Sequence, residues 1–223
     1  MKARVVRIDR RRMAGLIASL GDGHTPTVYT DRHFLVRELF WRRFEALLSL
    51  SGARARRRAM DFGGGNGVLT PTLSRLYERV ACVDLHTEMA EEIVKGDGLL
   101  NVSVHTGDVT SLGLPSDHFD SIIAPDVLEH IEDLRPVVAE FHRLLAPGGE
   151  LLVSAPSENR FYELGRRVFG YAKPHDHYHP ADFIERTVAE KLPLAQRRYF
   201  PVPIGWLGVF SLARFVKPAA EPV

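Results

Sequence analysis

The sequence predicts an α/β fold in which a doubly wound, mostly parallel sheet is covered by helices on both faces. Short apolar segments alternate with amphipathic ones between residues 58 and 156, as in successive strand and helix units. Strands joined through helices run parallel, because each crossover returns the chain to the same end of the sheet. Two further apolar runs within residues 195–218 predict strands that add an antiparallel edge.

The first fifty residues predict a helical extension to this sheet. A short amphipathic helix is expected around Met13–Leu20, and a longer one over residues 30–50. Apolar residues recur in the longer segment at three- and four-residue intervals, the pattern of an amphipathic helix. They are Phe34, Leu35, Leu39, Phe40, Phe44, Leu47 and Leu48. Thr30 or Asp31 is expected to cap this helix, because a short side-chain oxygen can accept a free first-turn N–H.

The remaining elements are expected in the following order. Strands are predicted at 58–62, 79–85, 101–108, 119–127 and 150–156. Helices are predicted at 68–78, 87–96 and 134–149. Residues 157–179 predict a loop or lid, and a last helix follows from about residue 180 to residue 192. We therefore divide the chain into an extension at 1–50 and a ligand-binding domain at 51–223, in which residues 157–192 face the substrate.

Length and composition limit the class of protein. A chain of 223 residues with 45% hydrophobic content can bury a sizeable core, so we expect one globular unit. The 29 basic and 28 acidic residues leave a net charge of +1, which gives no general attraction for nucleic acid. The arginine-rich segment Arg54–Arg58 is expected to be a solvated helix end rather than an RNA-binding patch.

The cysteine content and the lengths of the apolar runs indicate the cellular compartment. Cys82 is the single cysteine, which excludes an intrachain disulfide framework and fits a reducing, cytoplasmic location. No apolar stretch reaches the roughly 20 residues that a membrane-spanning helix requires. The apolar run Met13–Leu20 is near the lower length limit of a signal-peptide core, and we expect no signal peptide.

The aromatic and basic C-terminal segment has two interpretations. Trp206, Phe210 and Phe215 lie close in sequence to Arg214 and Lys217. Such a combination can touch a bilayer surface or a lipid-like acceptor. We favour the alternative, that these residues belong to two edge strands, and keep peripheral membrane contact open.

A glycine-rich loop, DFGGGNG at Asp61–Gly67, follows the first predicted strand of the sheet. Loops at the carboxyl ends of parallel strands are where doubly wound folds bind ligands. The dinucleotide pattern Gly-x-Gly-x-x-Gly/Ala fails here, because its last position is Val68 or Thr70. A P-loop fails too, since no Gly-Lys-Ser/Thr follows at the required distance.

The spacing Asp61-x-Gly63-x-Gly65-x-Gly67 resembles motif I of the class I S-adenosylmethionine-dependent methyltransferases. Further matches follow in order: VACVDL ending near Asp84, VHTGDV with Asp108, FDSIIAPDVLEHI with Asp126, and LLAPGGELLVSAP. The resemblance covers about residues 58–156. It implies a Rossmann-like, seven-stranded sheet, with S-adenosylmethionine as the cofactor.

The resemblance also implies a set of cofactor-binding residues. Asp61 would face the ammonium group, and Gly63 and Gly65 would let the methionine portion approach the backbone. Asp84 would accept from the ribose hydroxyls, Asp108 would contact the adenine amino group, and Val109 would pack near the ring. Asp126 would lie under the cofactor, and Phe62 and Leu85 complete the set beside their motif neighbours. Tyr29 either closes over the cofactor carboxylate or is ordinary packing.

Two histidines are the candidates for catalysis. His130 follows the fourth-strand motif, which borders the methyl group in this family, and imidazole is suited to proton removal near neutral pH. Its alternative role is simply that of a helix-start residue. The family commonly places a histidine of the cleft just before the penultimate helix, which favours His179 or His177, and we select His179.

The cluster His175–His179 also raises the question of a metal site. Pro174 and Pro180 favour a loop there, and the sequence identifies no further ligands. We therefore predict no metal.

The predicted function is methyl transfer from S-adenosylmethionine to a small-molecule acceptor. The alternatives are a non-catalytic cofactor-binding or interaction module on the same fold, and a methyltransferase for a lipid-like or macromolecular acceptor. No nucleic-acid partner is expected, and the methylated atom and the oligomeric state are not predicted.

Overall fold

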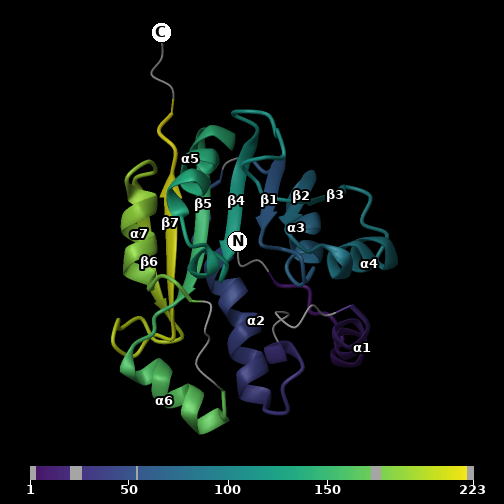
Figure 1. The fold of residues 1–223 in the computed structure, drawn as a ribbon, viewed down its shortest axis with the longest axis vertical. Coiled ribbons are helices and arrows are strands. Elements are labelled where there is room, and N and C mark those ends of the chain that lie inside the picture. The colour runs from purple at the N-terminus through teal and green to yellow at the C-terminus, as the bar shows by residue number, and fades with distance from the viewer. Residues whose placement is uncertain (1–3, 21–26, 54, 172–176, 220–223) are drawn as a thin grey trace.

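The computed structural model describes residues 4–20, 27–53, 55–171 and 177–219, which form a seven-stranded sheet with helices on both faces (Figure 1). The strand order is β3-β2-β1-β4-β5-β7-β6. The strands are β1 Arg58–Phe62, β2 Arg79–Asp84, β3 Val102–Thr106, β4 Phe119–Pro125, β5 Leu145–Pro156, β6 Leu194–Phe200 and β7 Phe210–Val216. Adjacent strands among β1–β5 pair parallel, and β7 is antiparallel to both β5 and β6. The predicted fold class is confirmed.

The centre of the sheet determines where a ligand can bind. β1 pairs with β2 on one side and with β4 on the other, so the strand order reverses between β1 and β4. In open α/β sheets the crevice at such a reversal is where ligands bind. The glycine loop after β1 therefore lies at this crevice.

Helices cover the sheet, and the first two of them belong to the N-terminal fifty residues (Figure 1). They are α1 Arg10–Leu20, α2 Phe34–Leu48, α3 Thr70–Leu76, α4 Glu88–Gly96, α5 Leu134–Leu144, α6 Arg160–Phe169 and α7 Ala181–Ala189, with short 3₁₀ turns η1 Thr27–Tyr29 and η2 Leu128–His130. None of the helices that the described residues form has the length and apolar content needed to cross a bilayer.

Two buried clusters fill the two faces of the sheet. Successive residues of β4 and β5 alternate between them, because successive strand side chains point to opposite faces. Ile122 and Leu151 pack with α5 and α7, whereas Ile123 and Leu152 pack with α2 and α3. The second cluster also holds Val5, Ile8, Met13, Trp41, Phe44 and Leu47 from the first fifty residues. The N-terminal segment therefore shares its core with the sheet.

The predicted cap of the long N-terminal helix is wrong. α2 begins at Phe34, its N-cap residue is His33, and no side chain caps it. Asp31 instead accepts a hydrogen bond from the backbone N–H of His33 at 2.6 Å, just before the helix. Thr30 donates its hydroxyl to the carbonyl of Thr27 at 2.9 Å. Both side chains thus make hydrogen bonds in the turn before α2 instead of capping the helix.

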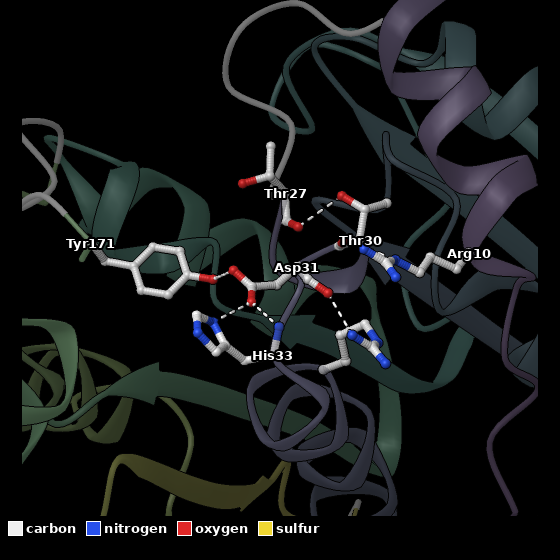
Figure 2. Close-up of polar contacts among 7 residues, drawn as sticks. Arg10, Thr27, Thr30, Asp31, His33 and Tyr171 are labelled. Carbon is white, nitrogen blue, oxygen red and sulfur yellow. Dashed lines mark hydrogen bonds and ion pairs between the residues drawn. The ribbon is translucent and has the colours of Figure 1, made fainter. Parts of the chain in front are cut away.

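Asp31 joins the N-terminal segment to the end of α6. Figure 2 shows the side chains of His33 and Tyr171 both directed at its carboxylate. Arg37 donates to the Asp31 carbonyl at 2.5 Å. Burial opposes ionisation of this carboxyl, but the hydrogen bonds from Tyr171 and His33 hold its pKa below the usual value. Residues 140 positions apart in the sequence are thereby connected.

The expected loop or lid at 157–179 contains a helix that the prediction missed. α6 is capped at its start by Asn159, whose side chain accepts from the N–H of Tyr162. It ends at Gly170, which has a φ of +78°. Two signals in the sequence, an Asn cap and a C-terminal glycine, therefore marked this helix. His175 and Asp176 of the histidine cluster lie outside the described residues.

The C-terminal segment forms the predicted edge strands. Phe210 and Phe215 are buried in β7, and Arg214 pairs with Glu150 at 2.7 Å. Trp206 lies in the β6–β7 loop and is 71% exposed. Of the aromatic residues considered for membrane contact, only Trp206 presents its surface to solvent.

Candidate functional site

The glycine loop turns sharply between β1 and α3. Gly63 has a φ of +73°, and a Cβ atom there would lie 2.4 Å from Val127. A Cβ on Gly65 would lie 1.9 Å from the carbonyl oxygen of His86. Glycine is required at both positions because neighbouring protein segments approach so closely.

Asp84 at the end of β2 holds the loop in place. Its carboxylate accepts from the backbone N–H of Gly65 at 2.8 Å and from that of His86 at 3.1 Å. The next strand contributes Asp108, which follows β3 and accepts from the N–H and the hydroxyl of Thr110, both at 2.8 Å.

A cavity of about 570 Å³ opens at the carboxyl ends of the strands. The predicted residues that line it are Phe62, Gly63, Gly65, Asp84, Leu85, Asp108, Val109, Asp126 and His130. Other parts of its wall are apolar, from Val83, Val127, Ile131 and Val137. The structure thus brings together residues from four separate sequence motifs. Tyr29, Asp61 and His179 are not among its lining residues.

A second, smaller cavity of about 70 Å³ adjoins the first, since Gly63, Asn66 and Asp126 line both. Tyr29 and Asp61 lie here, together with Arg43 from α2. Two of the predicted residues therefore occupy this second compartment.

Asp61 brings an incompletely satisfied negative charge to the small cavity. Its side chain is buried, and Oδ2 accepts from the hydroxyl of Thr70 at 2.6 Å. Oδ1 has no hydrogen-bond partner among the described residues. Burial raises the pKa of Asp61 to about 7, although the hydrogen bond from Thr70 lowers it in part. A carboxyl in this state favours a cationic ligand.

Arg43 brings a buried positive charge to the same cavity. It pairs with Asp126 and donates to the hydroxyl of Tyr29 at 3.2 Å, while its Nε has no hydrogen-bond partner among the described residues. The guanidinium carbon lies 4.6 Å from the ring centre of Phe44 and 5.0 Å from that of Phe40. Burial lowers the pKa of Arg43, whereas Tyr29 and Glu129 nearby raise it by a smaller amount.

Arg43 is a site residue that sequence reasoning missed. The sequence could have indicated it, because Arg43 lies three residues after Phe40 and four before Leu47 and so falls on the apolar face of the predicted helix. A charged residue on a buried face needs a partner.

The fourth-strand loop and the chain before α7 meet beside the large cavity. His130 and His177 lie with ring centres 4.8 Å apart. His177 Nδ1 is 2.7 Å from Glu158 Oε1, and the N–H of Tyr178 donates to the carbonyl of Glu129 at 2.8 Å.

His179 has different surroundings. Its Nε2 lies 2.9 Å from the carbonyl oxygen of Glu132, and its ring stacks on Phe183 at 4.3 Å. Of the two histidines considered before α7, His177 is the one beside His130.

Comparison with known proteins identifies the domain. A family model described as a methyltransferase domain matches residues 60–153. The matched residues make up less than half of the chain, and they contain the motifs that resemble those of the class I S-adenosylmethionine-dependent methyltransferases. Among curated relatives of this chain, the ubiquinone/menaquinone biosynthesis C-methyltransferase UbiE of Pseudomonas aeruginosa (strain LESB58) is 35% identical over 131 residues, which are 53% of this chain and 50% of the relative. UbiE of Erwinia tasmaniensis is 30% identical over 139 residues, 59% of this chain and 55% of the relative.

The chain spans about half the length of these curated relatives. Solved structures share its fold over more of its length. The N-methyltransferase NodS from Bradyrhizobium japonicum WM9, in complex with S-adenosyl-L-homocysteine, has a TM-score of 0.65 and 20% identity, and the match covers 94% of this chain and 98% of NodS. A methyltransferase from Aquifex aeolicus has a TM-score of 0.66 and 18% identity, covering 94% and 99%.

Proposed function

We propose that the protein transfers a methyl group from S-adenosylmethionine to a small-molecule acceptor. One observation carries this proposal: a buried carboxylate and a buried guanidinium, each with an unpartnered atom among the described residues, line one small cavity that adjoins a larger one. The two charges match the ammonium and carboxylate groups of an amino acid. The larger cavity has room for a nucleoside and an acceptor.

The residues present fit the cofactor. Asp61 would hold its ammonium group, and Arg43 with Tyr29 would hold its carboxylate. Asp84 would accept from the ribose hydroxyls, and Asp108 and Val109 would border the adenine. When bound, the cofactor supplies an electrophilic methyl group.

The protein's own contribution is positioning and the exclusion of water. Val127, Ile131 and Val137 give the large cavity apolar walls, which limit solvent access to the reacting groups. His130 lines the same cavity and can accept a proton from an acceptor hydroxyl at an imidazole nitrogen. His179 lies outside the lining residues, and we transfer its proposed role in the cleft to His177.

The acceptor we propose to test first is of the quinone type. The curated relatives are named C-methyltransferases of ubiquinone/menaquinone biosynthesis. We propose methylation at carbon on that basis, with a lipid-like acceptor at the exposed Trp206 as the less favoured alternative. We also retain the cytoplasmic location inferred from the single cysteine as a proposal.

The experiment is isothermal titration of the folded protein with S-adenosyl-L-homocysteine, followed by transfer of a labelled methyl group to a panel of reduced quinones and phenols. Saturable 1:1 binding and labelling of one acceptor class are expected. Absence of binding by a protein with an intact, cooperative melt would refute the proposal.

A second function on the same fold remains a candidate. The [4+2]-cyclase SpnF matches with a TM-score of 0.63 and 15% identity, covering 80% of this chain and 81% of SpnF. The fold is therefore shared by a protein named for another reaction. Tight cofactor binding without methyl transfer to any acceptor on the panel would favour a non-methylating role.

A further inference from the structure

Three side chains beside the large cavity form a cluster with the composition of a metal site. Glu129, His130 and His177 each offer one ligand atom, and these atoms all lie within 4.8 Å of one another. Two imidazoles with one carboxylate are the protein ligands of many catalytic zinc ions and of non-haem iron centres. Glu129 and His130 belong to η2, and His177 comes from the segment before α7.

Backbone hydrogen bonds hold the two segments of this cluster together. The N–H of Tyr178, next to His177, donates to the carbonyl of Glu129 at 2.8 Å. The N–H of His130 donates to the carbonyl of Val127 at 3.1 Å, which forms the η2 turn. The main chain therefore holds the two segments that carry these side chains next to each other.

A second acidic residue orients one of the histidines. Nδ1 of His177 lies 2.7 Å from Oε1 of Glu158, and the His177 side chain is only 9% exposed. With Nδ1–H donated to this carboxylate, Nε2 is the nitrogen left for a ligand. Histidines that bind metals almost always donate their other ring N–H to such a partner.

Glu158 occupies a backbone conformation that supports a specific role. Its φ is +48°, in the left-handed region that residues other than glycine seldom adopt. Such strain tends to persist at functional sites, where the surrounding structure imposes it. Here the strained residue is the one whose carboxylate meets His177.

The cluster is closed on one side and open on the other. The Glu129 side chain is buried, at 1% exposure, whereas His130 lines the cavity of about 570 Å³ together with Tyr178. An ion held by the three residues would have protein on the Glu129 side and the cavity on the His130 side. Catalytic metal sites keep such an open position for water or substrate.

We propose that Glu129, His130 and His177 bind a divalent cation of the zinc class, oriented by Glu158, and that this ion binds an acceptor hydroxyl as its oxyanion. The part concerning the acceptor rests on the proposed function, whereas metal binding does not. The proton of the hydroxyl leaves to bulk water, because a divalent ion lowers the pKa of a bound O–H group. This assigns His130 as a ligand in place of a base and revises the predicted absence of metal.

The geometry requires a small contraction. Bonds of about 2.1 Å to a tetrahedral ion place ligand atoms about 3.4 Å apart. The observed limit of 4.8 Å must therefore shorten by rotation of the exposed His130 and its neighbours.

The test is titration of chelator-treated protein with Zn²⁺ by calorimetry and with Co²⁺ by visible absorption. One equivalent of each ion is expected to bind. His177→Ala and Glu129→Gln are expected to weaken Zn²⁺ binding at least about 10-fold, and Glu158→Gln by about 10- to 100-fold, as for other residues that orient metal ligands. His105→Ala on edge strand β3 is the matched control and should bind like the wild type.

Titration of each variant with S-adenosyl-L-homocysteine separates this proposal from the proposed function. Wild-type protein that binds the nucleoside but takes up no stoichiometric metal would overturn the metal site alone. The metal site is equally overturned if His177→Ala and Glu129→Gln bind Zn²⁺ as tightly as His105→Ala does. Should Glu129→Gln fail to fold, His177→Ala and Glu158→Gln still decide the outcome.

Discussion

Asp61 and Arg43 place opposite charges in one small cavity, and each is nearly or fully buried. Burial of charge is costly unless the charge is paired and hydrogen-bonded. Arg43 is paired on one side by Asp126, and Asp61 is bonded on one side by Thr70. Both side chains also line the small cavity, which is consistent with a site arranged for a ligand that carries both charges.

The first prediction concerns Arg43. Arg43→Met keeps much of the side-chain volume and removes the charge, so the affinity for S-adenosyl-L-homocysteine should fall by about 10- to 100-fold, the worth of a hydrogen bond to a charged group. Calorimetric titration measures this change. Arg42→Met is the control, because Arg42 is exposed and pairs with Glu38. Equal affinities of the two variants would contradict the placement of the ligand carboxylate at Arg43.

The second prediction is a pH dependence that follows from Asp61. Its pKa of about 7 means that the free protein carries a neutral carboxyl below that pH. Binding an ammonium group requires the ionised form, so a proton is released and the affinity should rise with pH up to about 7 and level off above it. Titrations at pH 5.5, 6.5 and 7.5 measure the effect, and Asp61→Asn should bind more weakly and lose this dependence. A flat profile in the wild type would refute the role of Asp61.

The same shift affects stability with a definite sign. The folded-state pKa of Asp61 is raised above its unfolded value, so the folded state binds more protons between about pH 4 and pH 7. The contribution of this group to the free energy of unfolding therefore falls as the pH rises through that window. Denaturant melts of Asp61→Asn and wild type should differ increasingly in favour of the variant towards pH 7, in the absence of ligand.

At the scale of elements, Asn159 connects α6 to the loop between β6 and β7. Its side-chain oxygen accepts from the N–H of Tyr162, and its amide donates to the carbonyls of Gly205 and Gly208 at 3.0 and 2.7 Å. One residue thus starts a helix and fixes the loop that holds Trp206.

The third prediction separates these two roles of Asn159. Asn159→Ala removes both and should destabilise α6 by about 1 kcal/mol, with faster hydrogen exchange in residues 160–169 and 205–208. Asn159→Asp keeps the helix cap and loses the amide donor, so only the loop should exchange faster. Hydrogen exchange read by mass spectrometry distinguishes them. Identical exchange in the two variants would show that the cap and the loop are not independent.

The elements differ in how far sequence could predict them. β1, β2 and β4 were predictable because buried strands between helices have a local apolar signature. α6 was missed because its apolar residues do not face a core: Phe161, Leu164 and Val168 are 42%, 57% and 70% exposed. Sequence reasoning selected His179 over His177 without a periodicity to support it, because a loop bounded by prolines has no fixed period to say which side chain points inward.

At the scale of the whole molecule, the described part of the first fifty residues belongs to the folded core. Trp41, Phe44 and Leu47 of α2 are buried in the cluster that contains Leu73 and Ile93. Arg43 and Tyr29 from the same segment line the small cavity. Sequence could predict the α2 helix but not that its arginine meets Asp126 after β4, because that pairing depends on the tertiary fold.

The fourth prediction tests whether residues 51–223 fold without this segment. Removal of the N-terminal helices would expose a large apolar surface of the sheet, so the shortened chain should be aggregation-prone or lack a cooperative melt. Circular dichroism on heating measures this in comparison with the full chain. A shortened chain that melts cooperatively and binds S-adenosyl-L-homocysteine would show that the extension is dispensable.

Cys82 lies buried in β2, where its thiol contacts the carbonyl of Gly64 at 3.3 Å, and burial raises the pKa of the thiol well above its usual value. Thiolates rather than thiols react with maleimides, so the native protein should be almost inert to such reagents. Since Cys82 is the single cysteine of the chain, a cysteine introduced at Leu164 or Trp206 would accept a dye at one position. The wild-type sequence is thus a ready background for fluorescence measurement of how α6 and the β6–β7 loop respond to ligands.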